Sequence, residues 1–120
     1  MIDGIWAQQF AEDWISAWNA HELDQIFAHY SDDFEMSSPL IIDRMQEVSG
    51  TLKGKAAVRP YWQMGLDAIP PLKFELIEVF VGVDSITLYY RRTNGKTGAE
   101  TLIFNKEGKV IKGMAHYSRL

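Results

Sequence analysis

The first twenty residues carry apolar side chains at helical spacing. A stripe of aromatic residues recurs at every fourth position, at Trp6, Phe10, Trp14 and Trp18. This spacing puts all four rings on one helical face, which must be buried. Asp3 precedes the stripe and can accept hydrogen bonds from the first free N–H groups of the helix. The stripe predicts a core helix, with the alternative that its apolar face forms one wall of a ligand cavity.

A second, shorter helix is expected over residues 23–30, where apolar side chains follow an i, i+3, i+4, i+7 pattern. Asp32 and Asp33 follow it and are expected in a turn, because Ser-Asp-Asp after a helix is common turn and cap chemistry. Residues 34–38 then alternate as in a strand. Pro39 is expected to end that strand, since proline cannot donate a hydrogen bond to a neighbouring strand.

A third helix is expected within residues 55–69, which have apolar residues along one side. Pro60 favours a later start or a kink, because proline in a helix interior costs roughly 3 kcal/mol. Residues 40–53 have no clear period and are expected to be irregular, with a short strand over residues 47–52.

From residue 72 the pattern changes from helical to alternating spacing and stays alternating to the end of the chain. Turn residues divide this region, and Asn94-Gly95 is the strongest hairpin signal. The predicted strands cover residues 73–83, 86–93, 99–104 and 109–118. Helices followed by an antiparallel meander predict an α+β fold in which the helices cover one face of the sheet.

Counting across the predicted hairpins assigns side chains to the two faces, because opposite residues point to the same side. A two-residue turn at Asn94-Gly95 pairs Tyr89 with Glu100 and Arg91 with Gly98. Both faces of the sheet are apolar in this count, and a chain this short has helices enough to cover only one of them. We therefore expect a homodimer through the second face, in a symmetric contact. The polar and aromatic residues assigned to the first face include Glu78, Phe80, Tyr89, Arg91, Glu100 and Tyr117.

Glu78, Arg91 and Glu100 form a charged cluster on the first face in this count. One interpretation is a partly buried ion pair in which Arg91 bridges the two carboxylates. The other is the polar end of an apolar pocket, where a carboxyl group of perturbed pKa acts as an acid or a base. The residues alone leave both interpretations open.

Composition narrows the classes of partner. Apolar residues make up 47% of the chain, which favours one globular domain over residues 1–120. The net charge of −4 and the scattered Lys and Arg residues argue against nucleic acid or an anionic membrane as partner. The chain has no cysteine and no basic, apolar leader, so a cytoplasmic location is expected. His21, His29 and His116 lack metal-ligand spacing, and neither a metal nor another cofactor is expected.

Three segments together resemble the nuclear transport factor 2-like superfamily, which includes ketosteroid isomerases, SnoaL-like polyketide cyclases, scytalone dehydratase and limonene epoxide hydrolase. They are WISAWNAHELDQIFAHYSDDFEMSSP, LKGKAAVRPYW and IFNKEGKVIKGMAHY, and they span nearly the whole chain. The resemblance implies a cone-shaped, strongly curved sheet around a long first helix and two further helices. It also implies a pocket at the open end and dimers through the convex face.

The resemblance implies roles for three positions. Glu100 falls where ketosteroid isomerases keep a buried carboxylic acid that donates to the developing oxyanion. Ser38 falls where they have the aspartate base, and Trp14 falls where they have the oxyanion-hole tyrosine. An unassisted serine hydroxyl cannot take a proton from carbon near neutral pH. Ketosteroid isomerase activity is therefore not expected.

We expect a pocket for a small hydrophobic molecule, with Glu100 as acid or base and Arg91 setting its pKa. The reactions considered are cofactor-free proton transfer (isomerisation), cyclisation, dehydration and hydrolysis. The alternative is a non-catalytic binding or dimerisation module, in which Glu78, Arg91 and Glu100 form a structural ion-pair network. The predicted pocket lining is Trp14, Trp18, Met36, Ser38, Tyr61, Trp62, Glu78, Phe80, Tyr89 and Tyr117.

Overall fold

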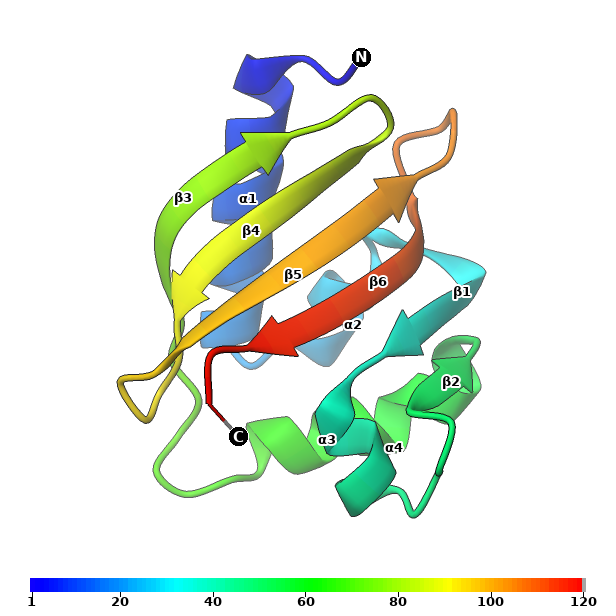
Figure 1. Ribbon diagram of the computed structural model, residues 1–120, viewed down its shortest axis with the longest axis vertical. Coiled ribbons are helices and arrows are strands. Elements are labelled where there is room, and N and C mark those ends of the chain that lie inside the picture. The colour runs from blue at the N-terminus through cyan, green and yellow to red at the C-terminus, as the bar shows by residue number, and fades with distance from the viewer. Residues whose placement is uncertain (120) are drawn as a thin grey trace.

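The computed structural model describes residues 1–119 and has helices packed on one side of a curved, open sheet (Figure 1). The predicted α+β fold is confirmed. None of the helices in this part of the chain is long and apolar enough to cross a membrane. The helices are α1 (Gly4–Asn19), α2 (Leu23–Phe27), α3 (Pro39–Arg44) and α4 (Lys55–Leu66). The strands are β1 (Tyr30–Ser37), β2 (Thr51–Lys53), β3 (Glu75–Val81), β4 (Ser85–Arg91), β5 (Thr97–Phe104) and β6 (Val110–Tyr117).

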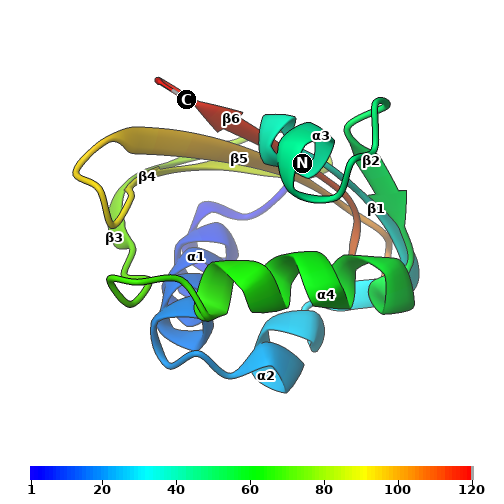
Figure 2. The same ribbon diagram turned by 90° about the horizontal axis from the view of Figure 1, so that it is seen from below.

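The six strands form one sheet in the order β2-β1-β6-β5-β4-β3. Strands β3 to β6 are the predicted antiparallel meander. Strand β1 lies parallel to β6 and extends the sheet, a pairing between distant segments that the local pattern does not reveal. Figure 2 shows α1, α2 and α4 together on one side of the sheet, so the two faces have different surroundings. We call the helix-covered side the inner face and the other side the outer face.

Helix α1 forms as its pattern predicts. The Asp3 carboxylate accepts a hydrogen bond from the backbone N–H of Trp6 at 2.9 Å, which satisfies one of the free donors at the helix start. Phe10, Trp14 and Trp18 are buried along the stripe. Trp6 is at the end of the stripe and remains 39% exposed. The helix therefore supplies a wall of indole and phenyl rings to the core beneath the sheet.

The segment expected to be irregular contains helix α3. Ser38 is its N-cap, with Oγ accepting from the backbone N–H of Leu40 at 3.1 Å, and Pro39 occupies the first turn. A Ser-Pro pair suits a helix start, because proline has no N–H to leave unsatisfied there. The placement of Asp32 and Asp33 in a turn was also wrong, since both lie in β1.

Helix α4 begins at Lys55 and runs through Pro60. Of the two predicted alternatives, a later start or a kink, the later start was wrong. Burial of the apolar side of the helix offsets the free-energy cost of the hydrogen bond that Pro60 cannot donate. Its residues Val58, Tyr61, Trp62 and Leu66 are all buried against the rest of the molecule.

The predicted register of the β4–β5 hairpin was wrong by one residue. The turn contains three residues, 93–95, because the backbone N–H of Arg92 bonds to the carbonyl of Lys96 at 2.7 Å. Leu88 is therefore opposite Glu100, and Tyr89 is opposite Ala99. A shift of one residue moves every side chain of a strand to the other face. Strand β4 accordingly turns Tyr90 inward, at 1% exposure, and leaves Arg91 exposed on the outer face.

We expect Tyr30→Phe to lower the free energy of unfolding by about 1–3 kcal/mol, because a buried donor then lacks its partner. Trp14 Nε1 donates to the Tyr30 hydroxyl at 2.8 Å, and both residues are almost fully buried. Urea denaturation measures the change. Tyr89→Phe removes a hydroxyl from the outer face and is the matched control, with an expected change within about 0.5 kcal/mol. Equal losses of unfolding free energy in the two variants would contradict a stabilising role for the buried hydrogen bond between Trp14 and Tyr30.

Candidate functional site

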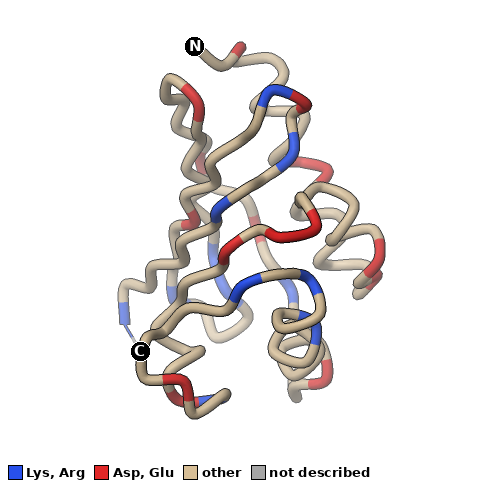
Figure 3. The backbone as a smooth tube through the Cα atoms, turned by 90° about the vertical axis from the view of Figure 1, so that its right-hand side faces the viewer, with Lys and Arg blue, Asp and Glu red and all other residues tan. Residues whose placement is uncertain are grey.

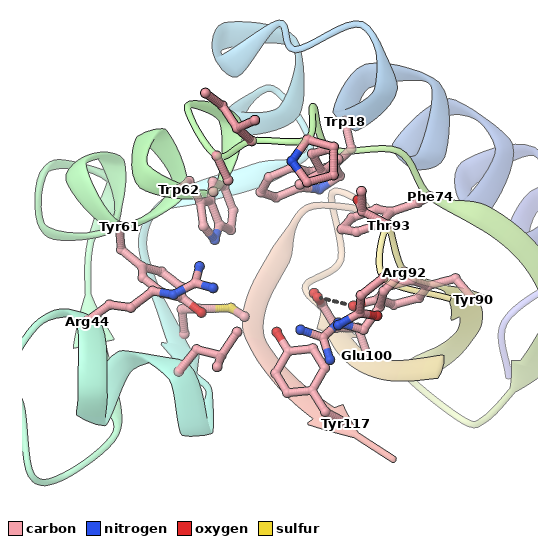
Figure 4. Close-up of a pocket in the computed structure, with 18 residues that line it drawn as sticks. Trp18, Arg44, Tyr61, Trp62, Phe74, Tyr90, Arg92, Thr93, Glu100 and Tyr117 are labelled. Carbon is pink, nitrogen blue, oxygen red and sulfur yellow. Dashed lines mark hydrogen bonds between the residues drawn. The ribbon is translucent and has the colours of Figure 1, made fainter. Parts of the chain in front are cut away.

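A pocket of about 310 Å³ lies between the inner face of the sheet, helix α4 and the segment that follows it (Figure 4). Its apolar surface includes Trp18 from α1, Met36 from β1 and Trp62 from α4. Phe74, which precedes β3, also lines the pocket, as do Ala68, Ile69, Pro70 and Leu72. The pocket is within the size range of small-molecule sites and is largely apolar, as such sites are.

Glu100 lines this pocket and is only 6% exposed. The Tyr90 hydroxyl donates to its Oε1 at 3.1 Å, the bond drawn in Figure 4. Burial raises the pKa of Glu100 from 4.5 to about 7, because the carboxylate loses hydration, and the Tyr90 bond offsets part of that rise. A group with this pKa exchanges its proton near neutral pH.

Gly98 makes room for the tyrosine that holds Glu100. A side chain at Gly98 would place its Cβ 3.1 Å from the Tyr90 hydroxyl and 3.3 Å from the carbonyl of His116. Strand pairing puts Gly98 directly opposite Tyr90. The absence of a side chain therefore allows the phenol to lie across β5 and reach Glu100.

A second polar group at the pocket is a pair of hydroxyls. The Tyr61 hydroxyl, which lines the pocket, donates to Ser38 Oγ at 3.0 Å, and both residues are buried. Tyr117 lines the wall contributed by β6. Burial, followed by smaller contributions that include the nearby Glu100 charge, raises the pKa of Tyr61 and of Tyr117. Both phenols stay protonated at neutral pH. The Tyr61 proton is donated to Ser38, so Tyr117 is the phenol that can donate a hydrogen bond to a ligand.

Trp14 lies behind the pocket rather than in its wall. Its ring stacks on Phe74 with centroids 5.9 Å apart and an interplanar angle of 14°, and its N–H is used by Tyr30. Trp14 therefore supports a lining residue without contacting a ligand. Trp18 does line the pocket, and its Nε1 has no hydrogen-bond partner within residues 1–119.

Two arginines that the sequence did not indicate also line the pocket. Arg44 is at the end of α3, and Arg92 directly follows β4. The Arg92 guanidinium carbon lies 4.2 Å from the centre of the Tyr117 ring, in a cation–π contact. The one-residue register error hid Arg92, because it exchanged this residue with Arg91. Arg44 was missed because α3 was not predicted.

The predicted charged cluster does not form. Arg91 donates to the backbone carbonyl of Gly95 at 3.0 Å, and Glu100 has Tyr90 as its partner. In the part of the chain that the structure describes, no ion pair joins Glu78, Arg91 and Glu100. The physical reason is the three-residue turn, which places Arg91 and Glu100 on opposite faces.

The pocket brings together about half of the predicted residues. Ser38 adjoins the pocket through its bond to Tyr61, and Trp14 lies behind Phe74. Glu78, Phe80 and Tyr89 lie on the outer face with Arg91. The predicted residues that line the pocket are Trp18, Met36, Tyr61, Trp62, Glu100 and Tyr117.

None of the three histidines lines this pocket. His21 bonds through Nε2 to the carbonyl of Leu72 at 2.8 Å, and the His29 ring contacts Phe10 edge-on at 4.9 Å. His116 is opposite Ala99 on the outer face. Over residues 1–119, no group of three or more His, Asp or Glu side chains is arranged to hold a metal ion.

Comparison with solved structures finds the same fold at several levels of similarity. A SnoaL-like protein of unknown function from Burkholderia thailandensis E264 is 47% identical, with 98% of each chain covered and a TM-score of 0.94. A nuclear transport factor 2-like protein of unknown function from Burkholderia pseudomallei K96243 is 16% identical, covering 93% of this chain and 90% of that one, with a TM-score of 0.77. A proposed ketosteroid isomerase from Kribbella flavida DSM 17836 is 14% identical, covering 95% and 78%, with a TM-score of 0.72.

No curated protein matches the chain. The family model described as the SnoaL-like domain matches residues 11–118, which include every residue that lines the pocket. The resemblance to the nuclear transport factor 2-like superfamily is thus confirmed along nearly the whole chain. The chain belongs to the SnoaL-like domain family.

Proposed function

We propose that this protein binds a small hydrophobic molecule in the pocket and uses Glu100 for cofactor-free acid–base chemistry on it. The reaction class is isomerisation, cyclisation, dehydration or hydrolysis. The observation that carries the proposal is a single buried carboxyl group in an apolar pocket, with a pKa of about 7. A catalytic acid or base works best when its pKa is close to the working pH.

The hydrogen bond to Glu100 supports this role. Tyr90 donates to Oε1, while Oε2 accepts no hydrogen bond within residues 1–119. One oxygen is therefore held in place, and the other is available to a ligand. The Tyr117 phenol, kept neutral by its raised pKa, can donate to a developing oxyanion.

A non-catalytic binding protein is the second candidate. Among the residues within 1–119 that line the pocket, Glu100 alone has a carboxyl group, so no second carboxylic acid from this part of the chain accompanies it. Ser38 and Trp14 also stand where ketosteroid isomerases have a base and an oxyanion donor. The likeness to a proposed ketosteroid isomerase is at 14% identity and carries the fold alone. Activity measurements distinguish the two candidates.

The test combines a thermal-shift screen of small apolar ketones, lactones, alcohols and steroids with turnover assays on the compounds that bind. We expect some to raise the melting temperature, because ligand binding to the folded state stabilises it. Glu100→Gln should retain binding and lose turnover by about 10²-fold or more. Glu78→Gln, on the outer face, is the matched control and should behave as the parent. Turnover unaffected by Glu100→Gln would favour the binding protein, and no stabilising compound would overturn both candidates.

The pKa of Glu100 also predicts a pH dependence of stability. Its folded-state pKa is raised, so the stability from the bound proton is fully present below about pH 4.5 and is lost as the pH rises through about 7. We expect the unfolding free energy of the parent to fall by roughly 3 kcal/mol relative to Glu100→Gln across this range. Urea titrations between pH 4 and about 8 measure the difference. Parallel curves for the two proteins would contradict the raised pKa.

We further propose that a second copy of the chain covers the outer face. No helix within residues 1–119 covers this face (Figure 2), and Phe80 is 55% exposed on it. Its centre is uncharged, with a hydrogen bond of 2.9 Å between the hydroxyls of Thr87 and Thr101. A symmetric dimer would bury this surface against its own copy.

Light scattering at micromolar concentration is expected to give the mass of a dimer. Thr101→Arg places a charge at the centre of the outer face and should give the mass of a monomer, because a buried unpaired charge is strongly unfavourable. Gln8→Arg, on the exposed side of α1, is the matched control and should remain dimeric. A monomeric parent would overturn the proposal.

A further inference from the structure

Two guanidinium groups reach the pocket from different parts of the fold. Arg44 approaches from the end of α3 and Arg92 from the end of β4, on opposite sides of the cavity in Figure 4. Arg44 is exposed and Arg92 is half-buried, so both lie where the pocket opens to solvent. We call this region the mouth. Trp18, Trp62 and Phe74 form apolar walls, and Glu100 is the buried acid.

The charges at the mouth have no carboxylate partner among the described residues. The ion pairs within residues 1–119 are Lys55 with Asp32, at 3.2 Å, and Arg59 with Asp24, at 3.0 Å. None of these residues lines the pocket. The contacts of Arg92 are the Tyr117 ring face and the carbonyl of Arg119 at 3.4 Å.

Glu100 does not act as the missing counter-ion. Its pKa is raised by burial and lowered only by the Tyr90 bond, with no contribution from either arginine. At neutral pH the residues within 1–119 therefore give the pocket two positive groups, Arg44 and Arg92, and one partly ionised acid, Glu100. The whole chain has a net charge of −4, and Figure 3 shows acidic and basic positions interspersed along the backbone. Positive charge at the mouth is thus a local property and not a reflection of overall composition.

A neutral ligand that filled this pocket would remove water from the half-buried Arg92 guanidinium, and from the part of Arg44 that faces the pocket, without replacing the lost hydrogen bonds. Leaving a charged group desolvated and unpaired is costly. A ligand carboxylate removes that cost, because guanidinium donors match its two oxygens in a planar arrangement. The arginines thus favour one chemical class among the small hydrophobic molecules that the pocket can hold.

We propose that the ligand is a hydrophobic carboxylate, whose anionic group is bound at the mouth by Arg44 and Arg92 while its apolar body lies between Trp18, Trp62 and Phe74. This inference rests on the proposed ligand site and specifies its substrate class.

Isothermal titration with 2-naphthylacetate and 2-naphthylacetamide tests the inference, because the two probes share shape and differ in charge. The parent protein is expected to bind the acid about tenfold more tightly than the amide. Arg44→Met and Arg92→Met should each reduce this preference and keep the affinity for the amide. Arg91→Met is the matched control, since Arg91 neighbours Arg92 in sequence and lies on the outer face. Its preference should equal that of the parent.

The outcomes separate the two proposals. Equal affinities for acid and amide in the parent, or a preference that survives both Arg44→Met and Arg92→Met, would overturn the carboxylate inference and leave the ligand site standing. Failure of both probes to bind the parent would overturn the carboxylate inference, while the wider thermal-shift screen decides the ligand site separately. Arg44 is exposed, so Arg44→Met decides the matter if Arg92→Met loses the fold.

Discussion

The pairing of β4 with β5 determines the chemistry around Glu100. With a three-residue turn, Leu88 lies opposite Glu100, and the tyrosine that reaches the carboxyl group is Tyr90. A turn one residue shorter would bring Tyr89 and Arg91 to the inner face, and an arginine beside Glu100 would hold its pKa low. The actual register gives a neutral phenol as partner, so burial controls the pKa. A single loop residue therefore separates a structural ion pair from a carboxyl group that can exchange its proton.

Burial of Glu100 in turn depends on aromatic packing behind the pocket. The Trp14 ring stacks on Phe74, and its N–H donates a hydrogen bond to the Tyr30 hydroxyl, so the ring is held in place by two contacts. Phe74 and Tyr90 have ring centroids 4.6 Å apart, which connects this packing to the residue that holds Glu100. Helix α1 supplies the ring wall, and its aromatic stripe is the local cause of the low-dielectric surroundings. The rings of Trp14, Phe74 and Tyr90 therefore contribute both to the packing of the core and to the burial that raises the pKa of Glu100.

Local signals in the sequence predicted much of the fold. The cap at Asp3, the stripe on α1 and the hairpin signal at Asn94-Gly95 depend on neighbouring residues, and each gave the right element. The parallel pairing of β1 with β6 depends on contacts between distant segments, which periodicity does not contain. Site residues failed where they depended on register: Arg92 lines the pocket, whereas Arg91 was predicted. The Ser38-Pro39 pair could have predicted α3, and with it a position for Arg44.

Binding of an anion at the mouth and titration of Glu100 would be linked electrostatically, because both groups line one pocket. An anion bound at the mouth adds negative potential inside a pocket of low dielectric, and this potential disfavours the ionised form of Glu100. The pKa of Glu100, about 7 in the free protein, would then rise on binding of a carboxylate. Near neutral pH the bound complex would hold Glu100 mainly protonated, with Oε2 free of protein donors. A carboxylate ligand would therefore favour Glu100 as a proton donor to the ligand over Glu100 as a base.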